Sequence, residues 1–136
     1  MDEGTNWKRS FKDYKQALAN LKDHVELAGS RKLTTHERQG AIQHFDTTIT
    51  LAHDVMTDYL ANQGIIGINE SGETVHYAFD NNLIEDKQVW IDMINEHKLA
   101  TEANGENNDD DFLDSIVNTY YSLFTVLAER IDELEK

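Results

Sequence analysis

Histidines and acidic residues are the side chains that could do chemistry in this chain, since the absence of cysteine excludes thiolate catalysis and zinc–sulfur sites. The six histidines are His24, His36, His44, His53, His76 and His97. Helical bundles that bind two metal ions use Glu-x-x-His twice, with two further glutamates from other helices. That tetrad occurs once here, from Glu73 to His76. We therefore predict no metal site and no cofactor, and histidines that are solvated or form helix caps.

The net charge of −14 is distributed unevenly along the chain. Residues 1–63 carry nine acids and eight bases, whereas residues 64–136 carry seventeen acids and four bases. A negative field repels phosphate backbones and attracts a basic protein surface. Nucleic-acid binding is therefore disfavoured, and a protein partner is expected.

The length of 136 residues predicts a single domain, 1–136, with one core. No apolar run approaches the roughly 18 residues of a membrane span, and the N-terminus lacks the layout of a signal sequence. With no cysteine to form disulfides, we expect a cytoplasmic protein that makes no membrane contact. The absence of proline favours long helices.

The basic and aromatic residues near the N-terminus are separated by the helical period. Trp7, Phe11 and Tyr14 recur at spacings of four and three, with Lys8 and Lys12 off that stripe. This pattern predicts an amphipathic helix over residues 6–27, with aromatic rings in the core and lysines in solvent. A nucleic-acid patch, which the same composition could indicate, is the less favoured interpretation.

Three further long helices and one short helix follow from the same periodicity. Thr34 and Glu37 form a capping box for a second helix that stops near Gly64. Residues 65–74 are predicted to be a loop, and residues 75–83 a short helix. A fourth helix opens at Asp86, and a last one, capped by Asn108 or Asp109, continues to about residue 134. The expected fold is all-α, an antiparallel up-down four-helix bundle with one short extra helix.

Three segments of the sequence resemble the nucleotidyltransferase substrate-binding protein family of the HEPN superfamily. These are FKDYKQALANLKDHVEL (11–27), RQGAIQHFDTTITLAHDVMTDYLANQGI (38–65) and AFDNNLIEDKQVWIDMINEHKLAT (78–101). The resemblance extends over roughly residues 7–134. It implies a small helical bundle that forms a homodimer and pairs with a minimal nucleotidyltransferase in a two-gene, toxin–antitoxin-like bacterial module.

The toxin branch of that superfamily cleaves RNA with the signature Arg-x-x-x-x-His, followed two residues later by a tyrosine that the partner can adenylylate. Laid on this chain, the signature falls on His97, Glu102 and Asn104. An imidazole is fully charged only below neutral pH, a carboxylate repels phosphate, and an amide has no hydroxyl to modify. The resemblance therefore implies a binding role without catalytic residues.

Two other arginine–histidine pairs fit or nearly fit the spacing of that signature. Arg31 and His36 lie across the first turn and the helix cap, and Arg38 and His44 lie six positions apart on one helix. The side chains of the second pair point about 120° apart. Neither pair lies where the resemblance places the active groove.

The best-supported hypothesis is thus a non-catalytic binding subunit whose partner supplies the catalysis. Its ligand or partner groove is expected near Trp90, Asp92, Glu96, His97 and Glu102. Two alternatives stay open. One is a HEPN ribonuclease toxin that uses a displaced arginine–histidine pair, and the other is a plain helical interaction protein.

Overall fold

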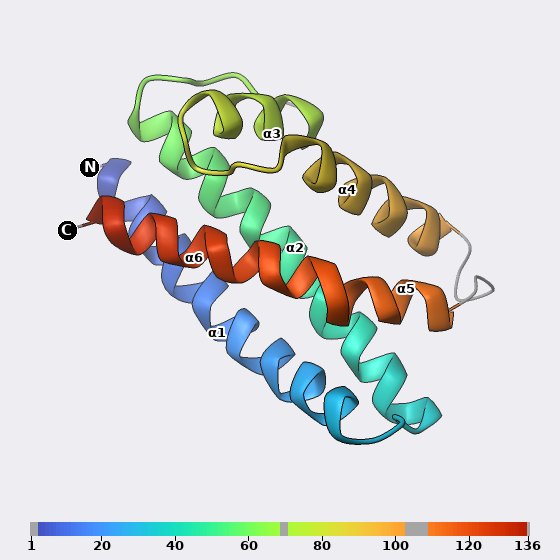
Figure 1. Ribbon diagram of the computed structural model, residues 1–136. Helices are drawn as coiled ribbons and strands as arrows, with labels where there is room; N and C mark the ends of the chain where they lie inside the picture. The colour runs from blue at the N-terminus through green and yellow to red at the C-terminus, as the bar shows by residue number, and fades with distance from the viewer. Residues whose placement is uncertain (1–2, 69–70, 103–108, 136) are drawn as a thin grey trace.

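The computed structural model describes residues 3–68, 71–102 and 109–135 and contains helices and no strand within those ranges (Figure 1). The elements are α1 (Glu3–Ser30), α2 (Thr35–Asn62), α3 (Ser71–Asp80), α4 (Lys87–Glu102), α5 (Asp109–Ser115), the π-helix η1 (Ile116–Tyr120) and α6 (Tyr121–Glu135). The predicted all-α bundle is confirmed. None of the described helices is long and apolar enough to cross a membrane.

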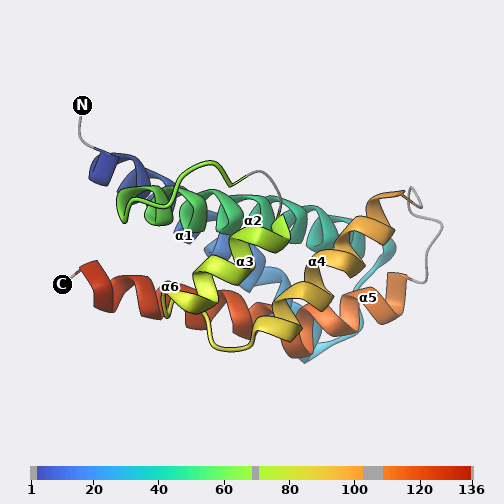
Figure 2. The same ribbon diagram turned by 90° about the horizontal axis from the view of Figure 1, so that it is seen from above.

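Four long helical segments alternate in direction, as predicted for an up-down bundle. Helices α1 and α2, each 28 residues, form an antiparallel pair, and α6 packs along α1 (Figure 1). Helices α3 and α4 lie across the face that α2 and α6 present, as the view from above shows (Figure 2). The start of α1 and the end of α6 therefore lie at the same end of the bundle.

The predicted capping box at the start of α2 is present. The hydroxyl of Thr34 accepts a hydrogen bond from the backbone N–H of Glu37, and the Glu37 carboxylate accepts one from the Thr34 N–H. Arg31 donates to both Glu37 oxygens at 2.8 and 2.6 Å. The Arg31 hydrogen bonds, followed by the one from Thr34, lower the pKa of Glu37 to about 2. The turn between α1 and α2 is thus fixed at both ends.

The short helix differs in position from its prediction. Helix α3 begins at Ser71 and ends at Asp80, so its first turn lies within the predicted loop, and Leu83 lies beyond its end. Asn82 adopts a left-handed conformation with φ 65°, and Leu83 is buried in the linker that follows. Arg130 of α6 donates to the Asn82 carbonyl oxygen at 2.5 Å and to Glu85 at 2.8 Å. Contacts with α6 therefore fix the conformation of this linker, and the chain makes no further helical turn there.

The last helical segment contains a π-helical turn that the sequence analysis did not predict. Its apolar positions Phe112, Ile116, Tyr120 and Phe124 are spaced by four residues three times in succession. Each step of four overshoots an α-helical turn by about 40°, so the stripe would rotate away from the core. The wider turn of η1, closed by a bond from the Tyr121 N–H to the Ile116 carbonyl, takes up this excess.

The ring of Phe45 lies at the centre of the core. Its centroid is 5.3 Å from that of Phe112, 5.9 Å from Tyr120 and 5.7 Å from Phe124. On α1, Tyr14 contacts Phe124 edge-to-face and donates a hydrogen bond to the Phe124 carbonyl at 2.6 Å. Aromatic side chains therefore connect α1 and α2 with the whole last segment.

Truncation of Phe45 to alanine is expected to lower the free energy of unfolding by about 3–5 kcal/mol, because a fully buried ring leaves a cavity that its neighbours cannot fill. The matched control is Phe79→Ala on α3, where the ring is 41% exposed and a loss below about 1 kcal/mol is expected. Urea unfolding followed by circular dichroism measures both. Equal losses would contradict the central role of Phe45.

Candidate functional site

Helix α4 divides the predicted groove residues between two faces. Trp90 and His97 face α2 and line a cavity there, whereas Glu96 faces η1. Asp92, one turn before Glu96, is exposed and accepts a hydrogen bond from Gln88 at 2.9 Å. Positions three, four and seven apart share a helix face, so Trp90 and His97 form one set and Asp92 and Glu96 another.

Two consecutive residues hold the C-terminal half of α4 against opposite neighbours. Glu96 accepts a hydrogen bond from the Tyr120 hydroxyl of η1. His97 places its Nε2 2.5 Å from Asp46 Oδ1 on α2, and its ring contacts Phe45 at 5.7 Å. The position at which the family resemblance places an arginine is therefore used for a contact between helices.

The other two positions of the family signature are not characterised by the structure. Asn104 lies outside the described residues. Helix α4 ends at Glu102, whose side chain also lies outside the described part of the chain. The assignment of Glu102 to the groove, and of both residues to the motif, stays a prediction.

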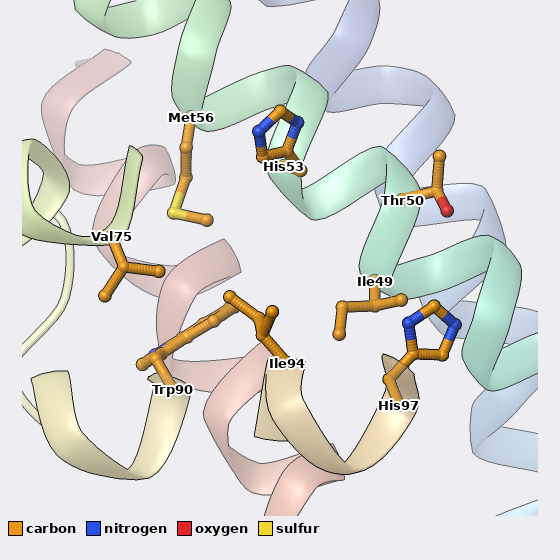
Figure 3. A pocket seen from close by; sticks show the side chains of 8 residues that line it. All are labelled: Ile49, Thr50, His53, Met56, Val75, Trp90, Ile94 and His97. Atoms are coloured by element: carbon orange, nitrogen blue, oxygen red, sulfur yellow. The ribbon is translucent and has the colours of Figure 1, made fainter. Parts of the chain in front are cut away.

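A cavity of about 180 Å³ separates α2 from α4 and is closed at one end by α3 (Figure 3). It is lined by Ile49, Thr50, His53, Met56, Val75, Trp90, Ile94 and His97. The side chains of Met56, Val75, Trp90 and Ile94 converge on one central space, and the two imidazoles lie along its margin (Figure 3). The arrangement is an apolar hollow with hydrogen-bonding groups at its edge, smaller than the roughly 300–1,000 Å³ of sites for drug-sized ligands.

The polar groups at the margin of this cavity are held in place by neighbours. His53 Nε2 lies 3.1 Å from the hydroxyl of the buried Thr74 on α3. Thr50 donates to the Asp46 carbonyl at 2.9 Å. His53 and Thr50 were not predicted as site residues, because only the packing of α2 against α3 and α4 brings them beside Trp90. Their spacing of three along α2 was a usable signal, since it places both on one edge of the helix.

Tyr120 is a hydrogen-bond donor in this structure and not a nucleophile. Its pKa is raised first by burial and then by the hydrogen bond to Glu96 and the charge of that carboxylate. The phenol is therefore protonated at neutral pH and stabilises the packing of α4 on η1.

The two alternative arginine–histidine pairs are engaged in other contacts. Both terminal nitrogens of Arg31 bind Glu37, and the exposed His36 lies in the first turn of α2. Arg38 lines a second cavity of about 450 Å³ beside the α1–α2 turn. His44 instead packs its ring on His24 of α1, with centroids 4.9 Å apart.

The single Glu-x-x-His tetrad also shows no arrangement for a metal ion. His76 places one ring nitrogen 3.2 Å from Asp80 and the other 2.9 Å from the Lys87 ammonium. Within the part of the chain that the structure describes, no group of three or more histidines and acids could hold a metal.

The family model described as nucleotidyltransferase substrate binding protein like matches residues 9–133. The chain belongs to that family. No curated protein matches its sequence.

Membership of the nucleotidyltransferase substrate-binding family indicates a binding role and interaction with a nucleotidyltransferase. The substrate-binding role that the family description names agrees with a site made of an apolar hollow and tethered polar groups.

Removal of the Tyr120 hydroxyl is expected to lower the free energy of unfolding by about 1–2 kcal/mol, because the half-buried Glu96 carboxylate loses its donor. Tyr120→Phe is compared with Tyr77→Phe, where the side chain is exposed and little change is expected. Urea unfolding measures both. A Tyr120→Phe variant as stable as the parent would show that the contact does not stabilise α4.

The imidazole of His24 predicts a loss of stability on acidification. Its pKa is lowered by burial and by the neighbouring His44, and its Nδ1 is buried without a hydrogen-bond partner among the described residues. As the pH falls, the His24 imidazole is protonated in the unfolded chain before it is protonated in the folded chain. The contribution of His24 to the free energy of unfolding is therefore complete above its unfolded pKa of about 6.5 and is lost as the pH falls below that value. Gly40 on α2 permits the close approach of the His24 ring, since a Cβ at position 40 would lie 3.1 Å from that ring.

The corresponding measurement is urea unfolding of His24→Asn at pH 7.5, 6.5 and 5.5. The loss of stability between the first and last pH is expected to be smaller than in the parent, whereas His36→Asn on the exposed cap turn should behave like the parent. An unchanged pH dependence in His24→Asn would refute the assignment.

Proposed function

We propose that this chain is the non-catalytic, homodimeric binding subunit of a two-component, toxin–antitoxin-like nucleotidyltransferase module. One observation carries the proposal. His97, at the position where the family resemblance calls for a cation, is bound to the Asp46 carboxylate. A side chain held in this way does not present an isolated positive charge to a phosphate, so this groove lacks the group that phosphodiester cleavage needs most.

The charge distribution supports a protein partner that supplies the catalysis. The excess of acids in residues 64–136 attracts a basic surface and accelerates its association. On α4, Asp92 is an exposed anion that no described salt bridge neutralises. Glu96 is less available for this role, because it already accepts a hydrogen bond from Tyr120.

The ribonuclease alternative has less support. The Arg31 guanidinium, which would have to bind a phosphate, already makes a two-point contact with Glu37. Such contacts have the geometry that a phosphate would need. The ring of His44 packs on another imidazole and is directed to α1.

The test of the proposal is copurification of the tagged chain from its native cells, followed by mass spectrometry. We expect a small nucleotidyltransferase to copurify at a fixed ratio, and the complex to weaken as salt is raised. Asp92→Asn should weaken association several-fold at low salt, whereas Asp13→Asn on the exposed face of α1 should not. Recovery of the chain without any transferase would contradict the proposal.

An assay for RNA cleavage separates the proposal from its alternative. The purified chain, alone and as a complex, is expected to leave RNA intact. Cleavage that is abolished by His36→Ala or His44→Ala would establish the ribonuclease instead.

A further inference from the structure

We propose that the cavity between α2 and α4 binds a small molecule with a ring-sized apolar body and a positively charged amine. This inference rests on the proposed function and specifies it, because the ligand would be the substrate other than the nucleotide. The juxtaposition that carries it is an apolar hollow lined by two histidines, each of which lies beside an exposed carboxylate of α2.

The size and walls of the cavity fit a single ring. Its volume is about 180 Å³, and engineered apolar cavities of roughly 150 Å³ bind benzene. The indole of Trp90 and the thioether of Met56 belong to its walls. An indole face attracts both aromatic rings and cations, and a thioether contacts ring edges favourably.

Negative charge lies next to two of the lining residues, although none of the described lining residues is itself acidic. Asp46, Thr50 and Asp54 are spaced by four along α2 and therefore share the edge of the helix on which Thr50 borders the cavity. The side chains of Asp46 and Asp54 are 59% and 54% exposed. His97 Nε2 lies 2.5 Å from Asp46, and His53 Nδ1 lies 4.0 Å from Asp54. The two carboxylates lie about 12 Å apart along the axis of α2, and Asp46 is already paired with His97. An amine that leaves the apolar body at this edge would therefore pair with Asp54.

Few bases lie on the two helices that form the opening. Helix α2 contains Arg38 alone, two turns before Asp46. On α4, Lys87 places its ammonium 2.9 Å from His76, which leaves Lys98 next to His97. With Asp46 paired to His97, Lys98 offsets no more than Asp54, and the net charge of −14 repels a nucleoside triphosphate. The nucleotide is therefore expected to bind the transferase partner, and this chain the other substrate.

Fluorescence of Trp90 gives a direct test with defined probes. In the full chain carrying Trp7→Phe, Trp90 is the single tryptophan. Benzylamine, benzyl alcohol, benzoate and ATP are titrated separately at low salt. The expected order of affinity is benzylamine, then benzyl alcohol, then benzoate, with no response to ATP beyond its absorbance. Equal or tighter binding of benzoate or ATP would overturn the proposal.

A charge-removing variant tests the role of the carboxylates without altering the cavity. Asp54→Asn should weaken benzylamine binding about two- to fivefold and leave benzyl alcohol binding unchanged. Glu129→Gln removes one exposed charge on α6 and should change neither. Equal weakening by both variants would show that only the net charge matters, and the site assignment would fail.

A cavity-filling variant tests the location of the bound ring. Ile94→Phe is expected to abolish binding of both benzylamine and benzyl alcohol, with its helical circular dichroism spectrum checked first. If the parent binds none of the probes at millimolar concentration, the ligand site is refuted. Copurification of a transferase would still support the proposed function, so a failure of the ligand site can be told apart from a failure of the proposed function.

Discussion

Burial of Phe45 is the constraint on which the rest of the structure depends. Its ring, which is fully buried, contacts Phe112 of α5, Tyr120 of η1, Phe124 of α6 and His97 of α4. One side chain of α2 thus sets the distances of the last three helical elements and of α4. Because interiors are close-packed, the position of this ring also fixes where the two polar contacts of α4 can form.

Two polar contacts hold α4 in the bundle. Glu96 accepts a hydrogen bond from Tyr120 of η1, and the adjacent His97 contacts Asp46 of α2. Consecutive residues thus attach α4 to two different neighbouring helices. Nearer the start of α4, the apolar cavity separates it from α2 (Figure 3). His97 belongs both to the contact with Asp46 and to the lining of the cavity, so the helix is anchored directly beside the hollow.

The acidic residues lie in two different settings in the structure. Asp46 and Asp54 are spaced along one exposed edge of α2, in the half of the sequence whose net charge is close to neutral. Among the residues whose side chains the structure describes, the acids of the second half are exposed, except for the half-buried Glu96. The overall charge is therefore distinct from these two local carboxylates, each of which lies beside a histidine that lines the cavity.

The sequence by itself determined the fold class, the long amphipathic helices, the capping box of Thr34 and Glu37, and the family. The fold class, the helices and the capping box follow from local periodicity and spacing, which depend on residues a few positions apart. The family follows from the resemblance of three segments of the sequence. The sequence also singled out Trp90 and His97, which line the cavity. It did not predict the partners of Glu96 and His97, which lie 24 and 51 positions away.

Tertiary structure alone decided those contacts, the pairing of His53 with Thr74 and the end of α3 before Leu83. Helical spacing states which side chains share a face, but not which face meets which neighbour. That choice depends on packing around Phe45, and it divides Trp90 and His97 from Asp92 and Glu96 although all four lie within two turns of one helix.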